Sequence, residues 1–98
     1  MKFSIQGKSM APYLLPHDTI HVSRLRYLLK SPNIGDIVLA RHPFRRNILI
    51  VKRIVAVQKG TYMLLGDNAM ESEDSASFGP LSERMIIGKV IKFQRTST

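Results

Sequence analysis

The sequence predicts a small, mostly-β domain whose antiparallel sheet is rolled or closed into a barrel-like shape. Segments dense in β-branched residues recur along the chain, and turns rich in glycine and proline separate them. A length of 98 residues, with 44% hydrophobic and 22% charged residues, suits one folded core. We therefore expect residues 1–98 to form a single domain without internal repeats.

The first half of the chain contains two predicted strands. Residues 19–23 alternate between apolar and polar side chains, and residues 37–41 are almost wholly apolar. Residues 27–30 are compatible with a short strand or a helical turn. Turns are predicted at residues 31–33 and at Gly35-Asp36, immediately before the second strand.

The second half opens with the strongest β signal of the chain, residues 48–57, which we expect to form a central strand. Lys59-Gly60 predicts a tight turn into a strand at 61–65. A long polar loop is expected from residue 66 to 80, and loops of that length in small domains are functional or disordered. Residues 85–93 predict the last strand, followed by a frayed tail at 94–98.

The composition excludes several function classes. The chain has no cysteine, so disulfides, thiolate catalysis and cysteine zinc sites are excluded. Its longest apolar stretches are far too short to cross a bilayer, and no secretory signal precedes them. A cytoplasmic location without a transmembrane segment is therefore expected.

The net charge of +8 raises anionic partners as a possibility. The basic residues are spread over several segments, and neither a helix-turn-helix pattern nor an aromatic platform accompanies them. We expect most of this charge to be solvated surface, with an acidic protein partner as the alternative and no nucleic-acid partner.

Lys52 is unusual because it is a charged residue within an apolar predicted strand. It lies in the middle of the strand at 48–57, with apolar residues on both faces, so it is expected to be partly buried. Burial disfavours the ammonium and lowers the pKa of a lysine, which makes the neutral amine available as a base. Alternatively, Lys52 pairs with Asp36, Asp67 or Asp74, or reaches the surface.

Ser9 lies in a segment whose glycine and proline predict a fixed turn. Such a turn can present a hydroxyl and neighbouring backbone N–H groups together. Most serines are simple surface residues, so Ser9 alone is weak evidence for a nucleophile.

Four motifs in one order change that estimate. They are Gly7-x-Ser9-Met10-x-Pro12, Gly35-Asp36-Ile37-Val38, Val51-Lys52-Arg53-Ile54-Val55 and Gly66-Asp67-Asn68-x-x-x-Ser72-x-Asp74-Ser75. With them, the chain resembles the type I signal peptidase family of serine proteases from about residue 5 to residue 90.

The resemblance implies a β-rich catalytic core with Ser9 as nucleophile and Lys52 as general base. It implies that Ser72 hydrogen-bonds the lysine and that Asp74 supports the site. The backbone N–H of Ser9 would hold the oxyanion, and Gly7 offers no side-chain donor at the position where some relatives have serine. No cofactor or metal is implied.

The sequence departs from the secretory members of the family. No membrane anchor precedes Ser9, and the short segment between Lys52 and Gly66 leaves no room for the β-domain that larger members insert. Ala76 replaces the arginine common after Asp-Ser. These departures put export processing in doubt.

One short branch resembles the chain more closely, the nickel-type superoxide dismutase maturation proteases. The run at 35–43, followed by Ile50-Val51-Lys52-Arg53-Ile54, carries this likeness. It implies removal of an N-terminal propeptide from a precursor of nickel superoxide dismutase. The alternatives are a signal-peptidase-like enzyme acting on membrane or exported preproteins, and a non-catalytic binding module on the same fold.

Other candidate residues are weaker. His17 and His21 would have metal-ligand spacing on a helix, but in a strand they are about 13 Å apart. His42 could in principle serve Ser9 as a base, but it lies in a predicted turn before Pro43. Asp18, Asp36 and Asp67 are interpreted as residues that lock turns. Met10 is expected to pack, or to line the site.

Overall fold

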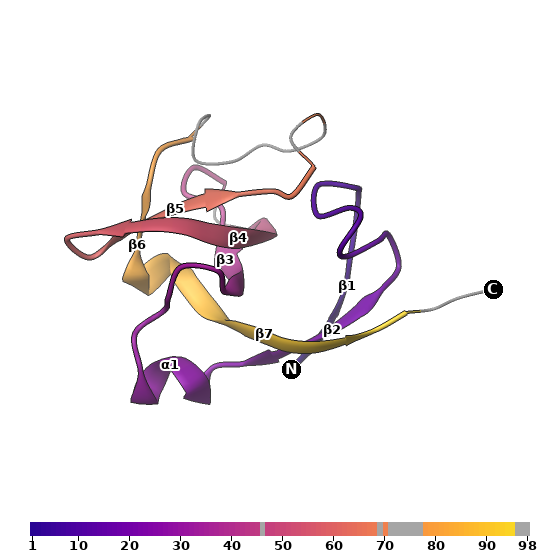
Figure 1. Ribbon diagram of the computed structural model, residues 1–98, viewed down its shortest axis with the longest axis horizontal. Coiled ribbons are helices and arrows are strands. Elements are labelled where there is room, and N and C mark those ends of the chain that lie inside the picture. Colours follow the sequence, from indigo (N-terminus) through magenta and orange to yellow (C-terminus); the bar gives the residue numbers. More distant parts are fainter. Residues whose placement is uncertain (46, 69, 71–77, 96–98) are drawn as a thin grey trace.

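A computed structural model describes residues 1–45, 47–68, 70 and 78–95. Within them, seven strands form one antiparallel sheet in the order β1-β2-β7-β3-β4-β5-β6 (Figure 1). The strands are β1 (Lys2–Ser4), β2 (Thr19–Ser23), β3 (Ile37–Arg41), β4 (Leu49–Gln58), β5 (Thr61–Leu65), β6 (Leu81–Ser82) and β7 (Ile86–Gln94), with the helix α1 (Leu25–Leu29) and the 3-10 turn η1 (Glu83–Met85).

β3 is the middle strand and is buried on both faces. Its alternating side chains enter two separate apolar clusters, Ile37 and Leu39 the first, Val38 and Ala40 the second. The first cluster packs β1, β2 and the segment after β1 against the sheet, and the second packs β4, β5 and β6. A continuous apolar sequence at 37–40 is what a strand buried on both faces requires.

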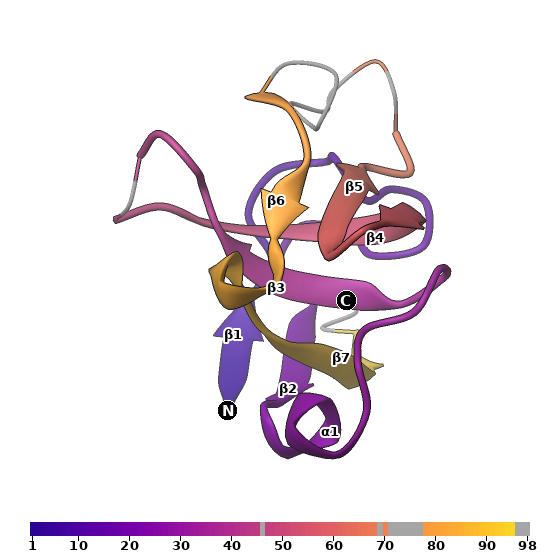
Figure 2. The same ribbon diagram turned by 90° about the vertical axis from the view of Figure 1, so that its left-hand side faces the viewer.

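The sheet is rolled about β3. Figures 1 and 2 show β1, β2 and β7 on one side of β3 and β4, β5 and β6 on the other, with β4 crossing the direction of β1 and β2. The predicted mostly-β, rolled antiparallel fold is confirmed. No helix among the described residues is long and apolar enough to cross a membrane.

β4 follows its prediction to within one residue and lies between β3 and β5. Its register with β5 shifts between Ile54 and Ala56, so Val55 forms a bulge. Ile50, Lys52 and Ile54 share one face as expected, but the bulge places Val57 rather than Ala56 on that face, opposite Tyr62. The uninterrupted alternation predicted for 48–57 is wrong beyond Ile54 for this reason.

The hairpin from β4 to β5 is closed by Lys59 and Gly60. Both have positive φ, 49° and 79°, the backbone shape that a two-residue hairpin favours. The predicted tight turn is therefore confirmed.

Several elements differ from the sequence prediction. Of the two alternatives for residues 27–30, the structure has the helical turn, at residues 25–29. The elements β1, β6 and η1 were not predicted, because segments of two or three residues carry no periodic signal. The tail does not begin at Gln94, which ends β7, and Arg95 is bound to Asp18 by several hydrogen bonds of 3.0 to 3.3 Å. That ion pair is the physical reason why the predicted fraying does not include these two residues.

Candidate active site

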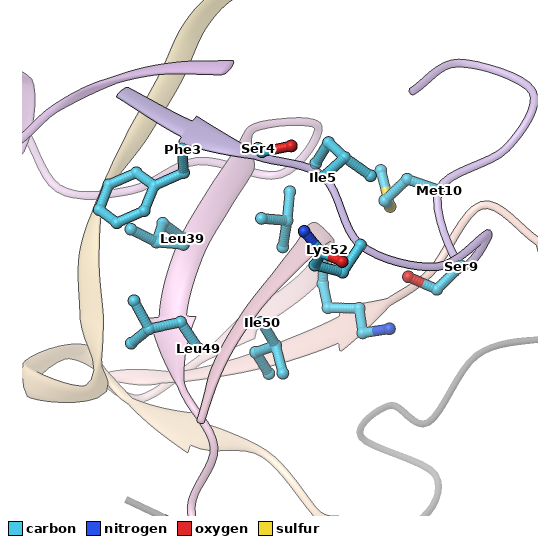
Figure 3. Close-up of a pocket in the computed structure, with 11 residues that line it drawn as sticks. Phe3, Ser4, Ile5, Ser9, Met10, Leu39, Leu49, Ile50 and Lys52 are labelled. Atoms are coloured by element: carbon cyan, nitrogen blue, oxygen red, sulfur yellow. The ribbon is translucent and has the colours of Figure 1, made fainter. Parts of the chain in front are cut away.

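A cavity of about 280 Å³ brings Ser9 and Lys52 together. Its walls come from the end of β1, the segment that follows it, the middle of β3 and the first half of β4. Most of the lining is apolar, and the polar members besides the two candidates are Ser4 and Gln6. Figure 3 shows the Ser9 hydroxyl and the Lys52 amine extending toward each other at the opening of this cavity.

Lys52 is buried, with 5% of its surface exposed. It lies opposite Val38 in the β3–β4 ladder, and its neighbours on the same face, Ile50 and Ile54, pack in the second cluster. The predicted partial burial is confirmed and is deeper than the alternation alone required. The side chain crosses apolar surroundings and ends at the cavity that Ser9 also lines (Figure 3).

Two of the acids considered as partners of Lys52 form ion pairs with other cations. Asp36 lies 3.5 Å from the Lys89 amine and accepts a 2.7 Å hydrogen bond from the Tyr27 hydroxyl. Asp67 forms an ion pair with Arg53 at 2.8 Å. Asp74 lies outside the described residues, as does Ser72.

Ser9 is half-buried in a tight turn after β1. Gly7 has a φ of 75°, a conformation that residues with a Cβ rarely adopt. The Ala11 N–H donates to the Lys8 carbonyl at 3.1 Å, and Met10 is 1% exposed within the first cluster. The next residue in the chain is thus fixed in the core, which holds the Ser9 backbone in place. The predicted fixed turn is confirmed, and Met10 both packs and lines the cavity.

The Ser9 N–H makes no backbone–backbone hydrogen bond with any other described residue. It lies on the same turn as the hydroxyl. An N–H group with this placement can donate a hydrogen bond to an oxyanion that forms next to Ser9.

The motif at Gly66-Asp67-Asn68 holds the Ser9 turn from outside. The Asn68 N–H donates to the Ser9 carbonyl at 2.8 Å, and the Asn68 Nδ2 donates to the Lys8 carbonyl at 3.1 Å. Asn68 therefore fixes two consecutive peptide units of the segment that carries the candidate nucleophile.

Arg53 joins this motif to two others. It donates to both carboxylate oxygens of Asp67, at 2.9 and 2.8 Å, and to the Gly35 carbonyl at 3.2 Å. The hydrogen bond with Asp67 raises the pKa of Arg53, so the guanidinium is charged throughout the ordinary pH range. Hydrogen bonds thus connect the four sequence motifs, at Gly7–Pro12, Gly35, Lys52-Arg53 and Gly66–Asn68, and two of them, the first and the third, line the cavity.

Sequence reasoning had assigned no role to Arg53 or Asn68. The available signal was their position beside Lys52 and within the fourth motif. Neither position reveals that the two residues bind partners 14 and 60 positions away in the chain, because those contacts depend on the tertiary fold.

The histidines lie elsewhere. His42 is buried against Phe78, and its Nδ1 accepts hydrogen bonds from the N–H groups of Phe44 and Arg45, each at 3.1 Å. It stabilises the β3–β4 turn and is not among the residues that line the Ser9 cavity. His21 contacts Gln94 from β2, and His17 precedes that strand with a φ of 74°.

Two of the three aspartates act as the sequence predicted. Asp18 accepts from the Leu15 N–H at 2.9 Å, and Asp36 accepts from the Asn33 N–H at 3.1 Å, so each carboxylate closes a turn. Asp67 instead fixes the loop through Arg53. Among the described residues, no group of three or more histidines and acids is placed to hold a metal ion.

Comparison with known proteins agrees with this arrangement. The family described as "Signal peptidase, peptidase S26" matches residues 1–58 and 55–93. The chain is 33% identical to mitochondrial inner membrane protease subunit 2 of Schizosaccharomyces pombe, covering 90% of this chain and 61% of that protein. It is 31% identical to mitochondrial ATP-independent inner membrane protease subunit 1a of Arabidopsis thaliana, covering 89% and 66%.

A bacterial relative matches over a shorter segment. Signal peptidase I of Aquifex aeolicus is 39% identical over 54 residues, which are 55% of this chain and 21% of that protein. The chain spans less than two thirds of the length of each of these three relatives.

Proposed function

Because the chain belongs to the signal peptidase, peptidase S26, family, we propose that it is an endopeptidase with Ser9 as nucleophile and Lys52 as general base. One observation carries the proposal: the buried Lys52 on β4 and the half-buried Ser9 in the turn after β1 line the same, mostly apolar cavity. Burial disfavours a charged ammonium, and the proposed mechanism uses the neutral amine as the base beside the hydroxyl.

The first half of the reaction forms an acyl-enzyme. The neutral Lys52 amine takes the Ser9 proton while Oγ attacks the scissile carbonyl, and the resulting oxyanion lies at the Ser9 N–H. The tetrahedral intermediate then collapses, the C–N bond breaks, and the Lys52 ammonium gives its proton to the leaving amine. The new N-terminus departs as a neutral amine.

The second half restores the enzyme. Lys52, again neutral, takes a proton from water, and the hydroxide attacks the Ser9 ester. Collapse returns the electron pair to Oγ, which recovers its proton from Lys52, and the acid product leaves. The same amine thus serves as base and acid in both halves.

Ser72 and Asp74, outside the described residues, keep the roles implied by the motif, a hydrogen bond to Lys52 and support of the site. Ser72→Ala is expected to slow cleavage without abolishing it. Equal rates for Ser72→Ala and the unmodified enzyme would remove Ser72 from the proposal.

The apolar lining favours an uncharged side chain of the substrate next to the scissile bond. We propose as substrate an N-terminal propeptide, specifically that of a nickel superoxide dismutase precursor, in the cytoplasm. The support for this substrate is the likeness of residues 35–54 to that branch. The names of the relatives favour a second candidate, preproteins at a membrane, since two of them are called inner membrane proteases.

The test is cleavage of two substrates side by side, a nickel superoxide dismutase precursor and a secretory preprotein, followed by mass spectrometry of the products. We expect the dismutase precursor to be cut once near its N-terminus and the preprotein to remain intact. Cleavage of the preprotein alone would select the second candidate.

Two variants separate the site from the rest of the chain. Ser9→Ala should abolish cleavage, whereas Ser4→Ala should retain it, because Ser4 lines the same cavity from β1 without facing Lys52 (Figure 3). Full activity of Ser9→Ala, with either substrate, would refute the proposed dyad.

A further inference from the structure

The helix α1 presents an apolar face that the rest of the described chain does not cover. Leu25, Leu28 and Leu29 are 61%, 80% and 75% exposed, and no residue of this helix is buried. Positions i, i+3 and i+4 lie on one side of a helix, so the three side chains point the same way. Transfer of such side chains from water into an apolar environment is favourable.

Tyr27 holds the helix to the sheet. Its ring packs beside the second cluster, and its hydroxyl donates to Asp36 at 2.7 Å. Because Tyr27 is the residue of α1 that faces the sheet, this attachment fixes the helix with its leucines pointing outward. The exposure is a property of the folded surface.

Cations surround the leucines. Arg24, Arg26 and Lys30 are exposed on and beside the helix. A hollow of about 530 Å³ continues the surface toward β7, where Arg24 and Arg84 lie beside the apolar side chains of Ile86 and Ile87. Glu83 is the acidic residue among those that line the hollow.

We propose that α1 and this hollow form a peripheral docking surface for an anionic membrane. Protruding aliphatic side chains ringed by arginine and lysine enter the headgroup boundary while the cations meet lipid phosphates. A second copy of this chain is disfavoured, because two such surfaces would bring like charges together. The six leucine and cation positions within residues 24–30 are all exposed, and Arg24 and Arg84 in the adjoining hollow add to the positive charge of this surface.

The docking surface lies far from the active site. Figures 1 and 2 both show α1 at the bottom of the molecule, below β7, and the loop between β1 and β2, which carries Ser9, above β7. The hollow beside α1 and the cavity at Ser9 share no lining residue, so membrane attachment through α1 involves none of the residues around Ser9. Binding to vesicles and cleavage of a soluble substrate should respond to different substitutions.

The experiment is co-sedimentation with vesicles of pure phosphatidylcholine and of an equal mixture of phosphatidylcholine and phosphatidylglycerol. We expect binding to the mixed vesicles only, weakened by added salt. Leu28→Ser with Leu29→Ser should lower the partition coefficient at least about tenfold. Replacing Arg24, Arg26 and Lys30 by glutamine should lower it about a hundredfold, at roughly 1 kcal/mol for each cation.

Matched controls make the result specific. Arg41, Arg45 and Lys59 are exposed, and their joint replacement by glutamine removes the same charge from other elements. Phe44→Ser removes another exposed apolar side chain, one that is 75% exposed. Both controls, and Ser9→Ala, should bind the mixed vesicles within about threefold of the unmodified protein.

Absence of binding to the mixed vesicles would overturn the proposal, as would equal losses in the control and α1 variants. Capture of a protein by the α1 face without vesicle binding would also overturn it. Circular dichroism of each variant should match the unmodified protein, because every substituted residue except Ser9 is exposed and Ser9→Ala removes a single hydroxyl. The proposal survives failure of the protease assignment, since vesicle binding does not depend on Ser9.

Discussion

A lysine with apolar neighbours on its strand can be a structural cation or a base. Lys52 is 5% exposed and ends at the cavity lined by Ser9, and two acids that sequence reasoning offered it, Asp36 and Asp67, form ion pairs with Lys89 and Arg53. The burial could be predicted from the apolar residues around it. Its meeting with Ser9 could not, because 43 positions of chain separate them and only the family resemblance joined the two.

Substitution of Lys52 distinguishes a base from a charge. Lys52→Arg keeps a cation that cannot lose its proton, and Lys52→Met keeps the length without a charge. Both should lower kcat at least about a thousandfold, because neither provides a neutral amine. The initial rate of cleavage of the precursor substrate measures this loss of kcat.

Stability gives the complementary readout. Lys52→Met should be as stable as the unmodified protein or more so, since an apolar side chain needs neither to bury a charge nor to give up a proton on folding. Lys89→Met is the control on β7, which β3 separates from β4, and this variant should keep its activity. An active Lys52→Arg variant would show that the charge, and not the base, matters.

At the scale of elements, the site depends on a contact between a strand and a loop. Arg53 follows Lys52 on β4 and holds Asp67, and Asn68 then holds the carbonyls of Lys8 and Ser9. In the proposed mechanism these are positioning residues, since they would act through the Ser9 turn and not on the substrate.

Removing Asn68 should loosen the Ser9 turn without unfolding the sheet. For Asn68→Ala we expect kcat to fall about tenfold to a hundredfold with little change in KM, because misplacement by an ångström affects the reacting geometry more than binding. Steady-state kinetics separate the two constants. The control is Asn47→Ala in the exposed β3–β4 turn. An equal fall in kcat for Asn47→Ala, or a change in KM alone for Asn68→Ala, would contradict the role of Asn68.

Sequence patterns served the long elements well and the short ones badly. The strands at 19–23, 37–41 and 61–65 have the predicted bounds, because β-branched runs bounded by turns are local signals. The bulge at Val55 and the short strands β1 and β6 depend on pairing partners distant in sequence. The helix at 25–29 has its leucines outside, so no buried face indicated it.

At the scale of the whole molecule, an ion pair ties the end of β7 to the segment after β1. Arg95 donates to the buried carboxylate of Asp18 and, through Nη2, to the Tyr13 carbonyl at 2.9 Å. The hydrogen bond from Arg95 lowers the pKa of Asp18 below its ordinary value of 3.8. Sequence reasoning predicted a frayed tail here, since residues 77 positions apart give no local sign of a contact.

The lowered pKa gives this tie a pH dependence. A carboxyl whose pKa is lower in the folded than in the unfolded chain stabilises the fold fully above the unfolded value, and the effect is lost as pH falls through the folded value. Arg95→Met should therefore cost about 1–2 kcal/mol at neutral pH. The difference from the unmodified protein should shrink as pH falls below about 4.

Urea unfolding of both proteins at several pH values measures this difference. A gap that stays constant down to strongly acidic pH would show that the contribution of Arg95 is packing against Phe93 and not its charge on Asp18.

The most direct test of the account is the rate at which a serine-directed acylating probe modifies the folded protein, with the modified residue located by mass spectrometry. The account predicts a single acyl group on Ser9, formed at least about a hundredfold more slowly in Lys52→Met and at an unchanged rate in Ser4→Ala. Labelling of Ser9 at the same rate with and without Lys52, or no labelling of Ser9 at all, would contradict it.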